Sequence, residues 1–218
     1  MALKYALFDL DGTLTDPGFG ITNCVQYALK HFGIIPATRE ELYPYIGPPL
    51  VYSFREFHGL SEAQAEQAVA LYRERFSSLG MLENELIDGV PELLEWLISQ
   101  GISPIVATSK PEEYTVEILK HFDLEKYFVF VGGNNLKEER PHKSDVIRYI
   151  LDRYPDIGSA NAVMIGDRMY DVEGAHAFGL PAVGVLYGYG DREELIKAGA
   201  DRIAENVSQL RQILSEML

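Results

Sequence analysis

Residues 3–16 read LKYALFDLDGTLTD, and this stretch decides the fold. Its first part, Leu3–Leu10, is a short apolar run of β-favouring residues, which is typical of a strand buried on both faces. Two carboxylates, Asp9 and Asp11, come where such a strand ends, and Gly12 permits a tight turn directly after them. The stretch therefore predicts a buried strand that delivers acidic side chains to one edge of a sheet.

Further short apolar runs have the same character, and helical patterns separate them. We expect strands at 103–107, 127–131, 162–165 and 182–186, and helices at 91–100, 112–122, 144–154, 170–178 and 193–198. Strands that alternate with helices of about ten residues are typical of parallel βαβ units. The predicted fold class is therefore α/β, with a doubly wound, Rossmann-like parallel sheet.

Residues 17–85 interrupt this alternation. They contain helical patterns near 20–32, 50–57 and 62–78, and no convincing strand. We therefore predict two domains. Residues 1–16 and 86–218 form the catalytic core, and residues 17–85 form an inserted, all-helical cap domain.

The composition restricts the possible partners and compartments. The formal net charge is -14, from 19 Lys and Arg against 33 Asp and Glu, which disfavours nucleic acids and anionic membranes as partners. The single cysteine, Cys24, excludes an intrachain disulfide. Neither a signal peptide nor an apolar stretch of the roughly 20 residues that span a bilayer is recognisable, so a cytoplasmic protein is expected.

The first acidic motif favours phosphate chemistry. Asp9 and Asp11 point the same way on an extended chain, and such close like charges repel unless a cation lies between them. Mg²⁺ takes carboxylate oxygens and keeps waters for a substrate phosphate. One carboxylate could attack phosphorus, and the other could protonate the leaving oxygen and then deprotonate water. The alternative, an Asx-rich turn before a helix, does not explain the whole string 9–16.

Two further segments could hold a phosphate. Thr108 and Ser109 follow the expected strand 103–107, and their hydroxyls could donate to a phosphoryl oxygen, although either could simply cap the next helix. Lys143 precedes a helix and could supply a positive charge to a phosphate, although most lysines are surface residues.

A second acidic pair follows another predicted strand. Asp167 comes directly after 162–165, and Asp171 lies one helical turn further along the same face. Both could complete the ligand set of a cation, or could be acids placed favourably at a helix N-terminus. The carboxyl ends of parallel strands meet at one edge of a sheet, so both acidic pairs are expected there.

Taken in order, these motifs resemble those of the haloacid dehalogenase superfamily. The order is Asp-x-Asp-Gly-Thr, a strand-end Thr/Ser, a lone Lys and Gly-Asp-x-x-x-Asp, and it spans most of the chain. The resemblance implies a hydrolase with Asp9 as the nucleophile, Asp11 as the general acid/base, and an aspartyl-phosphate intermediate. It also implies Mg²⁺ as cofactor, bound by Asp9, the backbone carbonyl of Asp11 and Asp167, with Asp171 in support.

The resemblance extends to the phosphate and the substrate class. Thr108 and Lys143 match the phosphate-holding positions of the superfamily. The helical insert and the segment GVLYGYG at 184–190 resemble the phosphoglycolate-phosphatase-like branch. This implies a phosphatase acting on a small phosphorylated metabolite, with phosphoglycolate as one candidate. A nucleotidase, a sugar phosphatase, a phosphomutase and a non-catalytic interaction module stay open as alternatives.

Substrate preference is expected to come from the insert. Gly47, in the rigid turn Ile46-Gly47-Pro48-Pro49, would allow a close backbone approach. Arg55 follows about two helical turns later and could pair with a substrate carboxylate. We expect a monomer, because no large apolar stripe stands out on the helices of the insert.

Overall fold

The computed structural model describes residues 3–36 and 38–218. The chain divides into two compact units. The described residues up to Thr15 form the first unit together with Leu86–Leu218, and Asp16–Glu85 form the second. Across the described ranges, we find no helix with the length and apolar character needed to cross a membrane.

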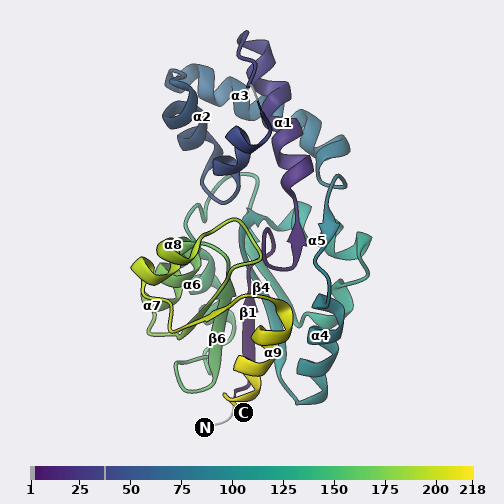
Figure 1. The fold of residues 1–218 in the computed structure, drawn as a ribbon, viewed down its shortest axis with the longest axis vertical. Helices are drawn as coiled ribbons and strands as arrows, with labels where there is room; N and C mark the ends of the chain where they lie inside the picture. The colour runs from purple at the N-terminus through teal and green to yellow at the C-terminus, as the bar shows by residue number, and fades with distance from the viewer. Residues whose placement is uncertain (1–2, 37) are drawn as a thin grey trace. The chain divides into compact units, whose positions relative to one another are not determined.

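A six-stranded parallel sheet forms the framework of the first unit (Figure 1). Its strand order is β5-β4-β1-β6-β7-β8, and each neighbouring pair runs parallel. The central strand β1 is hydrogen-bonded on both sides, and its last three residues are buried, as its continuous apolar run predicts. The bounds are β1 Tyr5–Phe8, β4 Ser103–Pro111, β5 Phe130–Asn134, β6 Ala162–Gly166, β7 Ala182–Val185 and β8 Arg202–Ala204.

Six helices cover the two faces of this sheet. The chain steps from β1 to β4 to β5 and then returns past β1 to β6, β7 and β8. Because such crossovers are right-handed, this reversal places α6, α7 and α8 on the face opposite α4 and α5 (Figure 1). The bounds are α4 Val90–Ser99, α5 Glu112–His121, α6 Lys143–Arg153, α7 Met169–His176, α8 Arg192–Ala198 and α9 Val207–Ser215.

A hydrophobic core lies between the sheet and α6, α7 and α8. Buried side chains from β1, β4 and β6 pack against those of the three helices: Leu7, Ile105, Met164, Val146, Ile150, Val172 and Leu195. The reversal of direction falls between β1 and β6. In open parallel sheets, ligands bind beyond the carboxyl ends of the strands at such a switch point.

The structure confirms the predicted α/β class with its doubly wound parallel sheet, and it corrects several details. Strand β5 begins three residues later than expected, because Glu125–Tyr127 form a 3-10 turn. The strand then includes Gly132, where a Cβ atom would come within 2.5 Å of the Ile150 side chain. Strand β8 and helix α9 were not expected. Strand β8 is only three residues long, so its sequence has little pattern to detect.

The second unit is mainly helical. Its helices are α1 Gly18–His31, α2 Leu50–His58 and α3 Glu62–Arg75, with a 3-10 helix at Glu40–Tyr45 and a π-helical turn at Phe76–Gly80. Contacts of α3 with α1 and α2 hold these helices together. Two short strands, β2 Thr15–Asp16 and β3 Glu85–Leu86, pair where the chain passes between the two units. The sequence did not predict these two strands.

Candidate active site

The carboxyl ends of β1, β4 and β6 carry the polar residues that the sequence singles out. Asp9 follows β1 directly, and its backbone N–H donates to the carbonyl of Ile165 in β6 at 2.9 Å. Thr108 lies within the last part of β4, and Asp167 follows β6. The parallel register therefore brings three segments, far apart in the sequence, to one edge of the sheet.

The loop after β1 is folded tightly against Asp167. The N–H of Gly12 donates to the carbonyl of Thr15 at 2.7 Å, and Gly12 has a φ of +75°. A Cβ atom at Gly12 would clash with the Asp167 carboxylate, so the close approach requires glycine. The side chain of Asp9 is fixed within the loop as well, because its Oδ1 accepts the Leu10 N–H at 2.8 Å.

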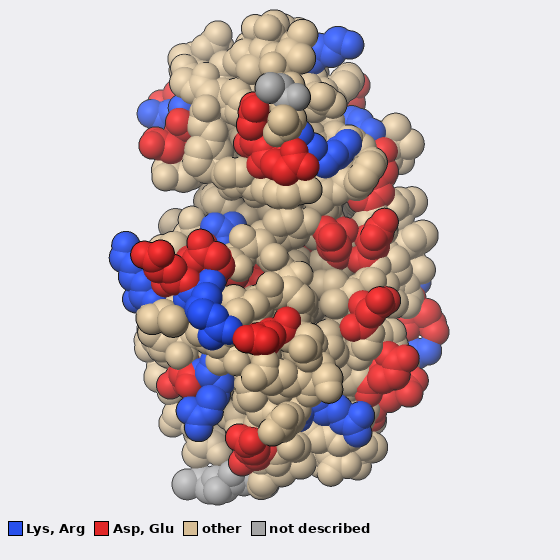
Figure 2. Space-filling model, viewed as in Figure 1, with Lys and Arg blue, Asp and Glu red and all other residues tan. Residues whose placement is uncertain are grey.

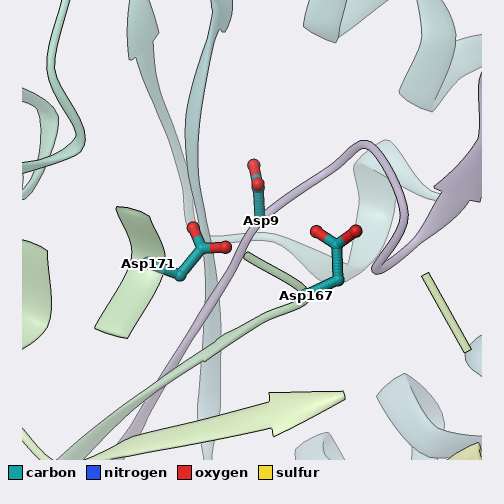
Figure 3. A group of neighbouring side chains, drawn as sticks. All are labelled: Asp9, Asp167 and Asp171. Atoms are coloured by element: carbon teal, nitrogen blue, oxygen red, sulfur yellow. The ribbon is translucent and has the colours of Figure 1, made fainter. Parts of the chain in front are cut away.

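Three carboxylates converge at this edge. Asp9, Asp167 and Asp171 each offer one oxygen, and these oxygens lie within 4.8 Å of one another. Figure 3 shows the three side chains, with Asp9, from the loop after β1, drawn between Asp167 and Asp171. Glycine at position 166 leaves room for the Asp171 carboxylate, which a Cβ there would overlap.

The two acids of the second acidic pair are almost fully buried. Asp167 and Asp171 are each 1% exposed. One oxygen of Asp167, Oδ2, accepts the Tyr189 N–H at 2.7 Å, whereas its buried Oδ1 has no hydrogen-bond partner among the described residues. Burial, reinforced by Asp171 and Asp9, raises the pKa of the Asp167 carboxyl well above its usual value. Burial likewise raises the pKa of Asp171 to about 7, against the opposing effect of Lys143.

Lys143 supplies the positive charge within this group of acids. Its side chain is 3% exposed, and its Nζ lies 2.9 Å from Asp9 Oδ1 and 2.7 Å from Asp171 Oδ1. The ammonium also donates to the carbonyl of Ala107 at 2.8 Å. Burial lowers the pKa of Lys143, but the carboxylates of Asp171 and Asp9 together outweigh it and raise this pKa above its usual value. Lys143 is therefore a buried, charged member of the site and no surface lysine.

Asp11 is not one of the three converging carboxylates, but Asp9 and Lys143 act on it electrostatically. Both of its oxygens face the ammonium of Lys110, with Nζ 2.8 Å from Oδ1 and 2.7 Å from Oδ2. Burial raises the pKa of the Asp11 carboxyl, while Lys110 acts in the opposite direction. The sequence reasoning did not single out Lys110. Its side chain is only 7% exposed, and the one available signal was its place at the end of a predicted strand.

The expected phosphate-holding hydroxyls lie in the sheet itself. Thr108 is 2% exposed, and its hydroxyl oxygen accepts the Lys110 N–H at 3.3 Å, while Ser109 is partly buried. The alternative reading, in which one of them caps the next helix, is wrong, because the N-cap of α5 is Pro111 and no side chain caps it. Asp171 is both a member of the acidic group and an acid at a helix N-terminus, because its Oδ2 accepts the Arg168 N–H at the start of α7.

The two residues expected to set substrate preference belong to the second unit. Gly47 has a φ of +110°, so this position requires glycine. Arg55 lies in the last turn of α2 with an exposed side chain. Their contact with a substrate stays a prediction.

With their protons removed, the three acids would outnumber the one lysine beside them, and two of these acids are almost fully buried. A divalent cation with a preference for oxygen ligands would offset the negative charge of these acids and use the unpartnered Oδ1 of Asp167. On the face shown in Figure 2, basic side chains occur in separate small groups among scattered acidic ones. At the site itself, the buried Lys143 and Lys110 supply positive charge.

The family model for haloacid dehalogenase-like hydrolases matches residues 6–185, a range that contains the four carboxylates and the two buried lysines of the site. The chain belongs to this family of hydrolases. A Pseudomonas aeruginosa protein named 5'-nucleotidase is 44% identical over 98% of this chain and 97% of its own length. A tyrosine-protein kinase of Mycobacterium tuberculosis, PtkA, is 37% identical over 97% of this chain and 72% of its own length. The crystal structure of a predicted phosphatase from Clostridium acetobutylicum is 44% identical, with a TM-score of 0.95, and covers 99% of this chain and all of its own.

Proposed function

We propose that this chain is a Mg²⁺-dependent phosphatase that hydrolyses small phosphate monoesters through an aspartyl-phosphate on Asp9. The proposal rests mainly on the different contacts of the two Asp9 carboxylate oxygens. Its Oδ1 is held by the Leu10 N–H and the Lys143 ammonium, while its Oδ2 has no hydrogen bond from the described residues. One oxygen is therefore fixed and the other is available to attack phosphorus.

The reaction would run in two displacements. In the first, Oδ2 of Asp9 forms a bond to phosphorus as the bond to the leaving oxygen breaks, and Asp11 gives that oxygen a proton. In the second, water attacks the phosphorus, its proton passes to Asp11, and the bond between phosphorus and Asp9 breaks. Inorganic phosphate leaves, and Asp11 holds a proton for the next substrate.

Buried charge around Asp9 would support both displacements. Lys143 keeps the attacking carboxylate in place, and its fixed ammonium can offset negative charge that develops on the phosphoryl oxygens. A bound Mg²⁺ would add positive charge at the same edge of the sheet, held by Asp9 and Asp167 with support from Asp171. Thr108 is the hydroxyl that would hold a phosphoryl oxygen, because it lies buried at the end of β4 beside this edge.

Nucleoside 5'-monophosphates lead the candidate substrates. The chain is 44% identical to a protein named 5'-nucleotidase over nearly the whole of both chains, which favours nucleotides as substrates. Phosphoglycolate, which the resemblance to the phosphoglycolate-phosphatase-like branch suggests, is the second candidate. Hydrolysis is also preferred over transfer to a protein tyrosine, since the kinase-named relative is less similar and this chain spans 72% of its length.

The test is phosphate release from a panel of nucleoside 5'-monophosphates, phosphoglycolate, sugar phosphates and pyrophosphate. The matched variants are Asp9→Asn and Asp152→Asn, the second of which makes the same chemical change on an exposed position of α6. We expect release by the parent and by Asp152→Asn, and none by Asp9→Asn. Release by Asp9→Asn at the rate of the parent would remove Asp9 as the nucleophile. Transfer of the phosphate to a sugar phosphate or a tyrosine peptide, with none to water, would replace the hydrolase with a mutase or a kinase.

A further inference from the structure

A buried ion pair between Lys110 and Asp11 also lies at this edge of the sheet. The Lys110 ammonium lies within 2.8 Å of both Asp11 oxygens, and the two side chains are 7% and 16% exposed. An ordinary surface ion pair is mobile and contributes little. Here two short contacts and low exposure restrict the Asp11 carboxylate to one orientation.

An irregularity in β4 places Lys110 at this position. Ala107 and Pro111 are four residues apart, whereas their partners Gly132 and Asn134 in β5 are two apart, so β4 carries two extra residues there. Such a bulge turns side chains away from the regular alternation of a strand. The Lys110 N–H donates to the Thr108 hydroxyl across the bulge, which closes it locally.

The neighbouring strand is shaped to accept this bulge. A Cβ atom at Gly133 in β5 would come within 2.7 Å of the backbone carbonyl of Lys110. Glycine in a strand often marks such a close approach of another backbone segment. The position of Lys110 therefore depends on three segments: the end of β4, the loop with Asp11, and β5.

The two buried lysines divide the acids of the site between them. Lys143 contacts Asp9 and Asp171, and Lys110 contacts Asp11. Without Lys110, the charge of Lys143 would still act on Asp11, but that lysine already contacts two other carboxylates. Asp11 would then be free to rotate, or would compete for the charge that holds Asp9.

We propose that Lys110 is a positioning residue that holds the Asp11 carboxyl group in the orientation of the base for hydrolysis of the aspartyl-phosphate. This inference rests on the proposed function, because it assigns Lys110 to the second displacement of that reaction. In this step water forms the new bond to phosphorus, its proton passes to Asp11, and the bond to Asp9 breaks. Two short contacts to one ammonium fix the orientation of the Asp11 side chain, and a base must present a correctly oriented oxygen.

The experiment separates the two displacements by rapid quench with p-nitrophenyl phosphate. The burst of nitrophenolate reports formation of the aspartyl-phosphate and counts the active enzyme. The decay of acid-trapped phosphoenzyme reports its hydrolysis. The variants are Lys110→Met, Asp11→Asn, the double variant, and Lys120→Met, which removes a lysine charge from an exposed position of α5.

We expect Lys110→Met to slow the decay by about 100-fold, the size of effect that misplacing a reacting group can have. Its burst with this good leaving group stays within a few-fold of the parent. In the Asp11→Asn background, Lys110→Met adds no further slowing, and Lys120→Met matches the parent throughout. Because the burst counts active sites, partial unfolding of a variant cannot imitate the slower decay.

Two results would overturn the role of Lys110: a decay in Lys110→Met as fast as in the parent, or a slowing that multiplies with that of Asp11→Asn. A different result would overturn the proposed role of Asp11 itself, namely a decay that Asp11→Asn leaves unchanged. Absence of any phosphoenzyme on Asp9 in all variants would remove the proposed function and not the pairing alone.

Discussion

Replacing Asp167 by Asn should stabilise the metal-free protein and abolish its response to Mg²⁺. In the parent, Asp167 is 1% exposed, its Oδ1 has no partner among the described residues, and burial raises its pKa well above the usual value. An asparagine could keep the hydrogen bond from the Tyr189 N–H through its own oxygen. Its NH₂ group would stand where Oδ1 was and could donate to the neighbouring carboxylates.

The magnitude follows from these contacts. An unsatisfied buried polar group costs about 1–3 kcal/mol, so the free energy of unfolding in EDTA should rise by about that amount in Asp167→Asn. In the parent, Mg²⁺ at about 100 times its dissociation constant should stabilise the folded state by about 2.7 kcal/mol. For a chain of this length, 1 kcal/mol shifts the Tm by about 2–4 °C, so Mg²⁺ should raise the Tm of the parent by about 5–10 °C.

The assay is thermal unfolding of the parent, Asp167→Asn and Asp152→Asn, each in EDTA and in Mg²⁺. We expect Asp167→Asn to have the highest Tm in EDTA and no shift with Mg²⁺, while Asp152→Asn follows the parent in both conditions. The reasoning is refuted if Asp167→Asn is less stable than the parent in EDTA and still gains as much from Mg²⁺.

Three further predictions concern pH, the metal and the second unit. In EDTA, the pKa of Asp171 is about 7 in the native state and about 3.9 in the unfolded state, so the native state holds the proton more tightly. The contribution of Asp171 to the free energy of unfolding should therefore be lost as the pH rises from about 4 to about 7. Urea unfolding of the parent and Asp171→Asn checks this, and a parent that gains stability relative to the variant over that range would contradict it. Mg²⁺ should restore activity after EDTA and Ca²⁺ should not, because the larger and looser coordination shell of Ca²⁺ misplaces the nucleophile and phosphorus. Equal phosphate release with both ions would show that the coordination geometry of the metal does not limit the reaction. Arg55→Ala should raise the KM for phosphoglycolate while leaving turnover of an aryl phosphate nearly unchanged, and an equal loss of kcat for both substrates would remove Arg55 as a contact for the substrate carboxylate.

The sequence alone predicts the sheet and the acidic cluster for one physical reason. Buried parallel strands read as continuous apolar runs, and whatever follows each run arrives at the same edge. Asp9 after β1 and Asp167 after β6 could therefore be expected to meet, and the structure places both in one group of carboxylates. The same reading missed β8, because a strand of three residues carries too little pattern.

Lys110 could not be predicted in this way. Its side chain turns toward Asp11 because β4 carries a bulge, and the bulge depends on a glycine, Gly133, that is 23 residues away in sequence. A lysine is usually exposed, and the place of this one at the end of a predicted strand was the one local signal of its burial. Lys143 was expected to reach a phosphate, but its contacts with two carboxylates also depend on tertiary packing.

The central claim is that Asp9 becomes covalently phosphorylated. Its most direct test is to quench Asp11→Asn during turnover with Mg²⁺, reduce the protein with borohydride, which converts an aspartyl-phosphate to homoserine, and map the peptides by mass spectrometry. The account predicts homoserine at position 9 when substrate and Mg²⁺ are both present, and at no other aspartate. Homoserine at a different position, or none at all while phosphate is still released, would contradict it.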